Sequence, residues 1–214
     1  TKRGVDELLI ESANGDVTLI PSTDGKVRVD GSASGTLHTP APEIKVSGSS
    51  VRVSANCPVW GFGECHSSVI VHVPPGTEVR VDAASGDIVA DGLSAGADLH
   101  TSSGDIAVDG VSGDISLDSA SGDVVARGLR STLAKAKTAS GDVDLRFATA
   151  PKAAEARTSS GDARILVPPG TEAYNVSAET DSGEDDIGVR QDPESLRFLR
   201  VETNSGDAVV DYGG

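Results

Sequence analysis

Apolar and polar side chains alternate along most of this chain, and no segment shows the 3.6-residue period of an amphipathic helix. Before a recurring glycine turn, every second position holds an apolar or small residue, and the positions between them are mostly charged or polar. Examples are Val79/Val81/Ala83, Ala97/Leu99/Thr101, Ala134/Ala136/Thr138 and Leu199/Val201/Thr203. This period of two predicts short β-strands that each bury one face.

A Ser-Gly-Asp turn separates these strands at nearly regular intervals. Its copies begin at Ser85, Ser103, Ser112, Ser121, Ser140, Ser160 and Ser205, and Asn14-Gly15-Asp16 and Ser182-Gly183-Glu184 are close variants. Gly113 lies at a half period. Apart from it, the glycine spacing grows from 18 residues, between Gly86 and Gly104, to 23 residues, between Gly183 and Gly206. Such a repeat indicates one structural unit per interval.

A second glycine corner lies half-way through each unit, at Asp91-Gly92-Leu93, Asp109-Gly110-Val111 and Arg127-Gly128-Leu129. Each unit is therefore strand, corner, strand, corner, and stacked units satisfy one another's backbone hydrogen bonds. We predict an all-β, single-domain β-solenoid of β-helix type, with coils of about 18–23 residues and Ser-Gly-Asp corners. Stacking in chain order predicts one inward ladder of Thr101, Ser119, Thr138, Thr158, Thr180 and Thr203.

Each residue of the Ser-Gly-Asp corner has a predicted local role. Glycine adopts positive φ without steric cost. The serine and aspartate are expected to accept hydrogen bonds from nearby backbone N–H groups in Ser- and Asx-type turns.

The domain organisation follows from where the repeat is regular. Residues 1–60 alternate less regularly and are interpreted as first coils or a cap, and residues 61–214 as the repeat solenoid, in one continuous domain. Val73-Pro74-Pro75-Gly76-Thr77 recurs as Val167-Pro168-Pro169-Gly170-Thr171. The paired prolines predict rigid corners, which indicate either a larger duplication or one connector used twice.

Composition limits which residue types can form the core and which classes of partner the chain can bind. Aromatic residues make up 3% of the chain, so the core must consist of Val, Ile, Leu, Ala and Thr. The net charge of −15 disfavours nucleic acid as a partner and leaves cations, basic proteins or neutral glycans. No apolar run is long enough for a transmembrane helix. Because the sequence begins at Thr1, we expect a targeting or tethering segment outside it.

One loop holds the candidate disulfide and the candidate partner contacts. Cys57 and Cys65 are close enough in sequence to pair in an oxidising compartment. Between them, Trp60 and Phe62 would contact a glycan or protein partner, or Trp60 would close the solenoid end. Cys57, Cys65, His66 and His72 lack the spacing of a common zinc motif.

The aspartates of the Ser-Gly-Asp corners are candidate calcium ligands. Like charges one coil apart repel each other unless each carboxylate is hydrogen-bonded or a cation lies between them. The candidate ligands are Asp87, Asp105, Asp123, Asp142 and Asp162. The Gly-Gly-x-Gly part of a calcium-binding β-roll is absent, which favours turn caps over calcium. No nucleophile elbow or phosphate-binding glycine loop is present, so we expect neither a catalytic site nor a cofactor.

The Ser-Gly-Asp-[Ile/Val]-x-[Val/Leu] units, the Thr-x-Ser-Gly-Asp lead-in and the Val-Pro-Pro-Gly-Thr corners resemble the bacterial DUF4097 family over roughly residues 10–212. The resemblance implies a β-solenoid similar to the DUF2807 head-domain adhesins, frequent association with the cell envelope, and no catalytic residues to carry over.

The leading hypothesis is a non-enzymatic, adhesin-like domain outside the cytoplasmic membrane. It would bind a cell-wall or surface glycan or an envelope protein, as a monomer or an end-to-end homodimer. The alternatives are a glycan-acting enzyme on a β-helix scaffold and an acidic DNA-mimic decoy for a basic protein.

Overall fold

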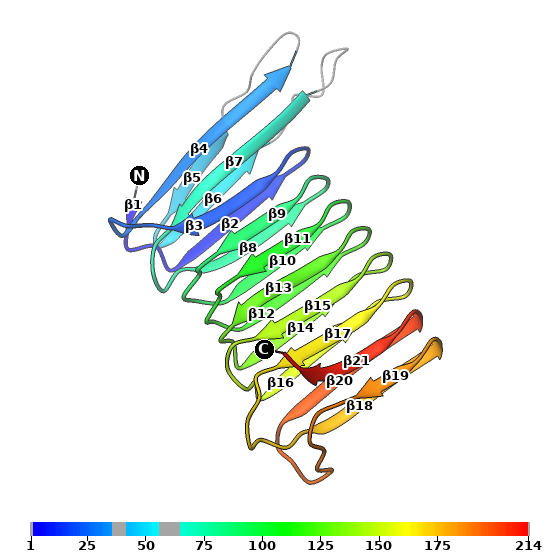
Figure 1. Ribbon diagram of the computed structural model, residues 1–214. Coiled ribbons are helices and arrows are strands. Elements are labelled where there is room, and N and C mark those ends of the chain that lie inside the picture. Colours follow the sequence, from blue (N-terminus) through cyan, green and yellow to red (C-terminus); the bar gives the residue numbers. More distant parts are fainter. Residues whose placement is uncertain (1, 36–41, 56–64, 214) are drawn as a thin grey trace.

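The computed structural model describes residues 2–35, 42–55 and 65–213, with side chains described for residues 4–31, 42–55 and 68–213. The described residues form two β-sheets and no helix, so this part of the chain offers no helical segment capable of crossing a membrane. Coils stack along one direction into an elongated molecule, with the Ser-Gly-Asp corners aligned along one edge (Figure 1). The predicted β-solenoid is confirmed.

The eleven-stranded sheet runs, in spatial order, through β1 (Lys2–Arg3), β4 (Lys26–Gly35), β7 (Cys65–Val73), β3 (Val17–Pro21), β9 (Ile88–Asp91), β11 (Ile106–Asp109), β13 (Val124–Leu129), β15 (Val143–Phe147), β17 (Ala163–Val167), β21 (Ala208–Tyr212) and β19 (Asp185–Ile187). The ten-stranded sheet runs through β18 (Asn175–Ser182), β20 (Phe198–Ser205), β16 (Ala153–Arg157), β14 (Leu133–Lys137), β12 (Ile115–Ser119), β10 (Ala97–Thr101), β8 (Glu78–Ala83), β2 (Glu7–Ser12), β6 (Ser50–Ala55) and β5 (Glu43–Ser47). Each regular coil contributes one strand to each sheet.

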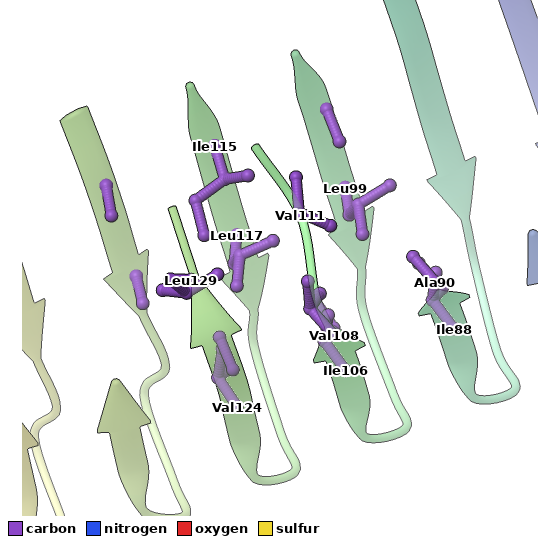
Figure 2. Close-up of a cluster of buried hydrophobic side chains, with 14 of the residues drawn as sticks. Ile88, Ala90, Leu99, Ile106, Val108, Val111, Ile115, Leu117, Val124 and Leu129 are labelled. Carbon is purple, nitrogen blue, oxygen red and sulfur yellow. The ribbon is translucent and has the colours of Figure 1, made fainter. Parts of the chain in front are cut away.

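Parallel pairing keeps equivalent residues of successive coils in register, as Val79, Ala97, Ile115 and Ala134 show. Inward-facing aliphatic side chains from both sheets fill the space between them (Figure 2). This core is aliphatic as predicted, except that Phe147 and Tyr174 are also buried in it. The second corner is also confirmed: Gly92, Gly110 and Gly128 all have positive φ.

The coils do not stack in chain order at either end, so the ladder predicted in sequence order is wrong there. β20 lies between β16 and β18, which places Thr203 beside Thr180 and leaves β18 and β19 outermost. At the other end the β2–β3 coil lies between β6–β7 and β8–β9. Strands from both sides of residue 60 therefore pair with each other, and the division into 1–60 and 61–214 stays a prediction.

The two Val-Pro-Pro-Gly-Thr segments occupy equivalent places in this unusual order. The segment at 73–77 joins β7 to β8 and passes the β2–β3 coil. The segment at 167–171 leads from β17 towards β18 and passes the position of the β20–β21 coil. Both copies thus stand where the chain skips one coil, which favours one connector used twice.

Candidate functional site

The Ser-Gly-Asp corners form a continuous hydrogen-bonded ladder along one edge of the molecule. The Asp123 backbone N–H donates to Asp105 Oδ1 at 2.8 Å, and the Asp142 N–H donates to Asp123 Oδ1 at 2.8 Å. The same bond recurs along the series Asp16, Asp87, Asp105, Asp123, Asp142, Asp162, Asp207 and Glu184. The carboxylates therefore join neighbouring coils, which corrects their interpretation as caps of their own turns.

The inward hydroxyls form a second ladder beside the first. Thr138 Oγ1 donates to the Gly122 carbonyl of the preceding coil at 2.9 Å, and Thr158 Oγ1 donates to the Gly141 carbonyl at 2.8 Å. A buried carbonyl is costly unless it has a donor, so this hydroxyl lets the coil close tightly. The edge thus has a structural role that needs no ligand.

Calcium at Asp87, Asp105, Asp123, Asp142 and Asp162 stays an untested hypothesis, and the absence of a bound metal stays the prediction. In each, one carboxylate oxygen accepts a backbone N–H of the next coil. Across the described ranges, no group of three or more His, Cys, Asp or Glu side chains is arranged to hold a metal ion.

Cys57, Trp60 and Phe62 lie outside the described residues, and so do the side chains of Cys65 and His66. The disulfide and the partner contacts therefore stay predictions. His72, the remaining zinc candidate, has its Nε2 3.3 Å from Asp30 Oδ2.

The outer face of the ten-stranded sheet carries most of the described ion pairs. Glu155 lies 3.4 Å from Lys135 Nζ and also contacts Arg157, whose Nε is 2.7 Å from Glu202. Lys137 Nζ lies 2.7 Å from an Asp118 oxygen. These side chains alternate with the buried residues of their strands, so strand register fixes their spacing.

An apolar hollow interrupts this charged face over β14, β16 and β20. Leu133, Ala153 and Phe198 are register partners in one outward row, and Leu133 and Phe198 are 48% and 49% exposed. The small Ala153 between two large side chains leaves an open hollow of about 450 Å³. Lys135, Arg157, Arg200 and Glu155 also line it, so an apolar floor lies beside three cationic groups and one carboxylate.

An acidic groove of about 470 Å³ lies on the same face, over β8 to β12 and next to β2. Its lining includes Glu7, Glu78, Asp98 and Asp114. Arg80 also lines it and lies 2.9 Å from Asp98, and hydrogen bonding to Asp82, with the charges of Asp82 and Asp98, raises the pKa of Arg80.

Charge is distributed unevenly along the chain. Seven of the 18 Lys and Arg residues fall between residues 127 and 157, a stretch that contains three acidic residues. Of these seven, Lys135 and Arg157 line the apolar hollow, beside Glu155, whereas Arg127 and Arg146 lie on the eleven-stranded sheet. Sequence reasoning missed this site, although the cation cluster and the apolar residues at outward positions, Leu133 and Phe198, would have indicated it.

A family model described as Toastrack DUF4097 matches residues 5–213. The chain belongs to the Toastrack DUF4097 family. The resemblance inferred from the repeated corners is thereby confirmed, and the Toastrack match covers every strand from β2 to β21. A comparison with curated proteins found no match.

Two solved structures are similar to this Toastrack chain. One is from Clostridium sporogenes and is provisionally described as a cell adhesion protein; it is 13% identical, has a TM-score of 0.45, and the match covers 98% of this chain and 94% of that one. The other is from Bacteroides fragilis and is provisionally described as an adhesin; it is 14% identical, has a TM-score of 0.45, and the match covers 99% and 93%.

Proposed function

We propose that this Toastrack protein is a non-enzymatic, adhesin-like binding domain that holds an anionic surface polymer on the outer face of its ten-stranded sheet. The apolar hollow between Leu133 and Phe198, whose lining includes three cations and one carboxylate, is the observation that carries the proposal. Solvent-exposed aromatic and aliphatic groups beside cations are typical of surfaces that bind a partner.

The residues of the hollow suit a sugar or polyol that bears carboxylate or phosphate groups. The Phe198 ring and the Leu133 and Ala153 methyl groups offer apolar contacts to the C–H faces of a ring. Lys135 and Arg200 contact Glu155 and Glu202 in the free protein, and on binding they would donate charge-assisted hydrogen bonds to the anion instead. The flat row of parallel strands continues past the hollow on both sides, as an extended polymer requires.

We also propose that the protein lies outside the cytoplasmic membrane and is tethered to the cell envelope. The closely spaced Cys57 and Cys65 support this placement, because disulfides persist in oxidising compartments. Measuring the intact mass with and without reductant tests it. Free thiols in protein recovered from its native compartment would oppose it.

Co-sedimentation with isolated bacterial cell walls across a salt series tests the binding function. We expect saturable binding that weakens as salt rises, because counterions compete for Lys135 and Arg200. Extracting phosphate-containing polymers from the walls separates phosphate from carboxylate as the bound group. Phe198→Ala should weaken binding about fivefold, since an aromatic contact is worth about 1 kcal/mol.

Ile70→Ala is the matched control, because Ile70 is also a half-exposed large apolar side chain but lies on the eleven-stranded sheet. It should bind as the parent chain does. Equal binding by the parent and Phe198→Ala, or no binding at any salt concentration, would remove the hollow as the binding site.

The acidic groove supports a second candidate function, hydrolysis or lysis of a glycan. Paired carboxylates are the usual groups for acid–base work on glycosidic bonds, and Glu7 and Glu78 are register partners at this groove. Incubation with wall glycans, followed by an assay for reducing ends, tests it. Product formation that Glu78→Gln abolishes would establish the enzyme, and no product would leave binding as the function.

A further inference from the structure

The strand that ends the ten-stranded sheet, β5, exposes apolar side chains that lie on the same face as the core residues. Its inner-face residues Ile44 and Val46 are register partners of Val53 and Val51, which are 0% and 2% exposed. Ile44 and Val46 themselves are 49% and 54% exposed. Two aliphatic side chains thus continue the core row without a neighbouring strand to cover them.

Among the strands that the structure describes, none pairs with the outer side of β5, which is the terminal strand in the sheet order. Ser47 and Ser50 flank a two-residue turn, so this pair, and every second pair after it, exchanges backbone hydrogen bonds. The N–H and C=O groups of Ile44 and Val46 consequently point to the free edge. Such an edge adds another strand readily.

We propose that this edge pairs with the same edge of a second copy, to give a two-fold symmetric dimer in which β5 lies antiparallel to the partner's β5. A register centred on Ile44 places Ile44 against its equivalent and Glu43 opposite Lys45, twice over. A register centred on Lys45 would instead place two lysines opposite each other, which is destabilising. In the single chain Glu43 and Lys45 contact each other at 3.1 Å, and both side chains are mostly exposed, so they are free to exchange partners.

The opposite end of the molecule is unsuited to such pairing. β18, β19 and the turn between them carry the carboxylates Glu179, Asp181, Glu184, Asp185 and Asp186, and residues 175–189 include no Lys or Arg. Two such ends would repel, and charged edge strands are a known protection against strand addition. Association through β5 therefore closes at two copies, as an isologous interface does.

The two-fold axis would leave the apolar hollows of both copies on the same side of one continuous sheet. β16, at the centre of the hollow, is the eighth strand counted from β5. At about 4.8 Å per strand the two hollows would lie about 70 Å apart. This consequence rests on the proposed function, and it would let one dimer hold an extended polymer at two points.

Sedimentation equilibrium of the chain without ligand tests the dimer independently of polymer binding. We expect the mass to rise from the chain mass of 21.7 kDa to twice that value as concentration increases. Ile44→Asp and Lys45→Glu should each remain monomeric, whereas Ile70→Asp should dimerise as the parent chain does. Circular dichroism and the urea midpoint of each variant show that it is folded.

The charge register has its own test. Glu43→Lys and Lys45→Glu should each be monomeric alone but form a mixed dimer when combined, and the double exchange should restore the homodimer. A parent chain that is monomeric up to a concentration of about 1 mM would overturn the proposal. So would a dimer that survives Ile44→Asp, masses beyond two copies, or failure of the double exchange.

Discussion

At the residue scale, the corner depends on close contact between coils rather than on turn propensity alone. Gly122 has φ +138, and a Cβ added there would lie 2.2 Å from the Gly104 carbonyl oxygen. Gly128, at the second corner, has φ +62, but its added Cβ would meet nothing nearer than 3.4 Å. Positive φ is thus shared by both corners, whereas lack of space is specific to Ser-Gly-Asp.

Gly122→Ala should therefore destabilise the protein by more than about 4 kcal/mol, because both strain and a backbone clash must be relieved. Gly128→Ala, the matched control, should cost about 1 kcal/mol for the left-handed backbone alone. Urea unfolding of the two variants measures the difference. Equal losses would contradict the role given to close contact.

Asp123→Ala should cost about 1–2 kcal/mol, because the Asp142 backbone N–H loses its acceptor. Asp123→Asn keeps an acceptor oxygen and should lose less. The same unfolding curves, recorded with calcium chloride and with chelator, test the calcium hypothesis. We expect coinciding midpoints, and a midpoint that rises with calcium concentration would show that the aspartate ladder binds the ion.

At the element scale, strand faces were predictable but strand neighbours were not. The period-two pattern fixes which side chains of β18 and β20 point inward, and the structure buries that side of β20. Both strands carry an aliphatic residue, a second small or β-branched residue and a threonine in the same register: Val176, Ala178 and Thr180 against Leu199, Val201 and Thr203. The pattern alone would allow either strand to pair with β16. The sequence therefore could not show that β20, rather than β18, is the neighbour of β16.

The segment between β17 and β18 contributes one large buried side chain, Tyr174, to the core. Tyr174 is 1% exposed, and burial, the largest effect, raises the pKa of its phenol above the ordinary value of about 10. The folded state thus keeps the neutral phenol at a pH where the unfolded chain ionises. Stability from this group is complete below pH of about 10 and is lost as pH rises through the folded pKa.

Tyr174→Phe should therefore show a smaller fall in the urea midpoint between pH 9 and pH 11 than the parent chain, in a range set by the ordinary tyrosine pKa of about 10. Unfolding curves at closely spaced pH values provide the comparison. Parallel curves for the two proteins would mean that other groups govern alkaline unfolding.

At the scale of the whole molecule, composition predicted an aliphatic core, which the structure shows apart from the buried Phe147 and Tyr174, and it predicted the charge of the surface only on average. A net charge of −15 suggested cationic or neutral partners. The fold separates charge, with carboxylates at the β18–β19 end and along the corner ladder, and cations over β14 to β20. Leu133 and Phe198 became a site only because parallel register placed Ala153 between them. The sequence could mark Leu133 and Phe198 as apolar residues at outward positions, but it could not show that they lie in one row, because each belongs to a different strand.

The most direct measurement of the central claim is a methyl-detected NMR titration of the chain with a short oligogalacturonate, an anionic sugar polymer. The account predicts saturable shifts of the Leu133 and Ala153 methyl signals, with little change at Ile70 and none with a neutral oligosaccharide of the same length. Shifts confined to the acidic groove or another surface, or no shifts at all, would contradict the assignment of the apolar hollow as the binding site.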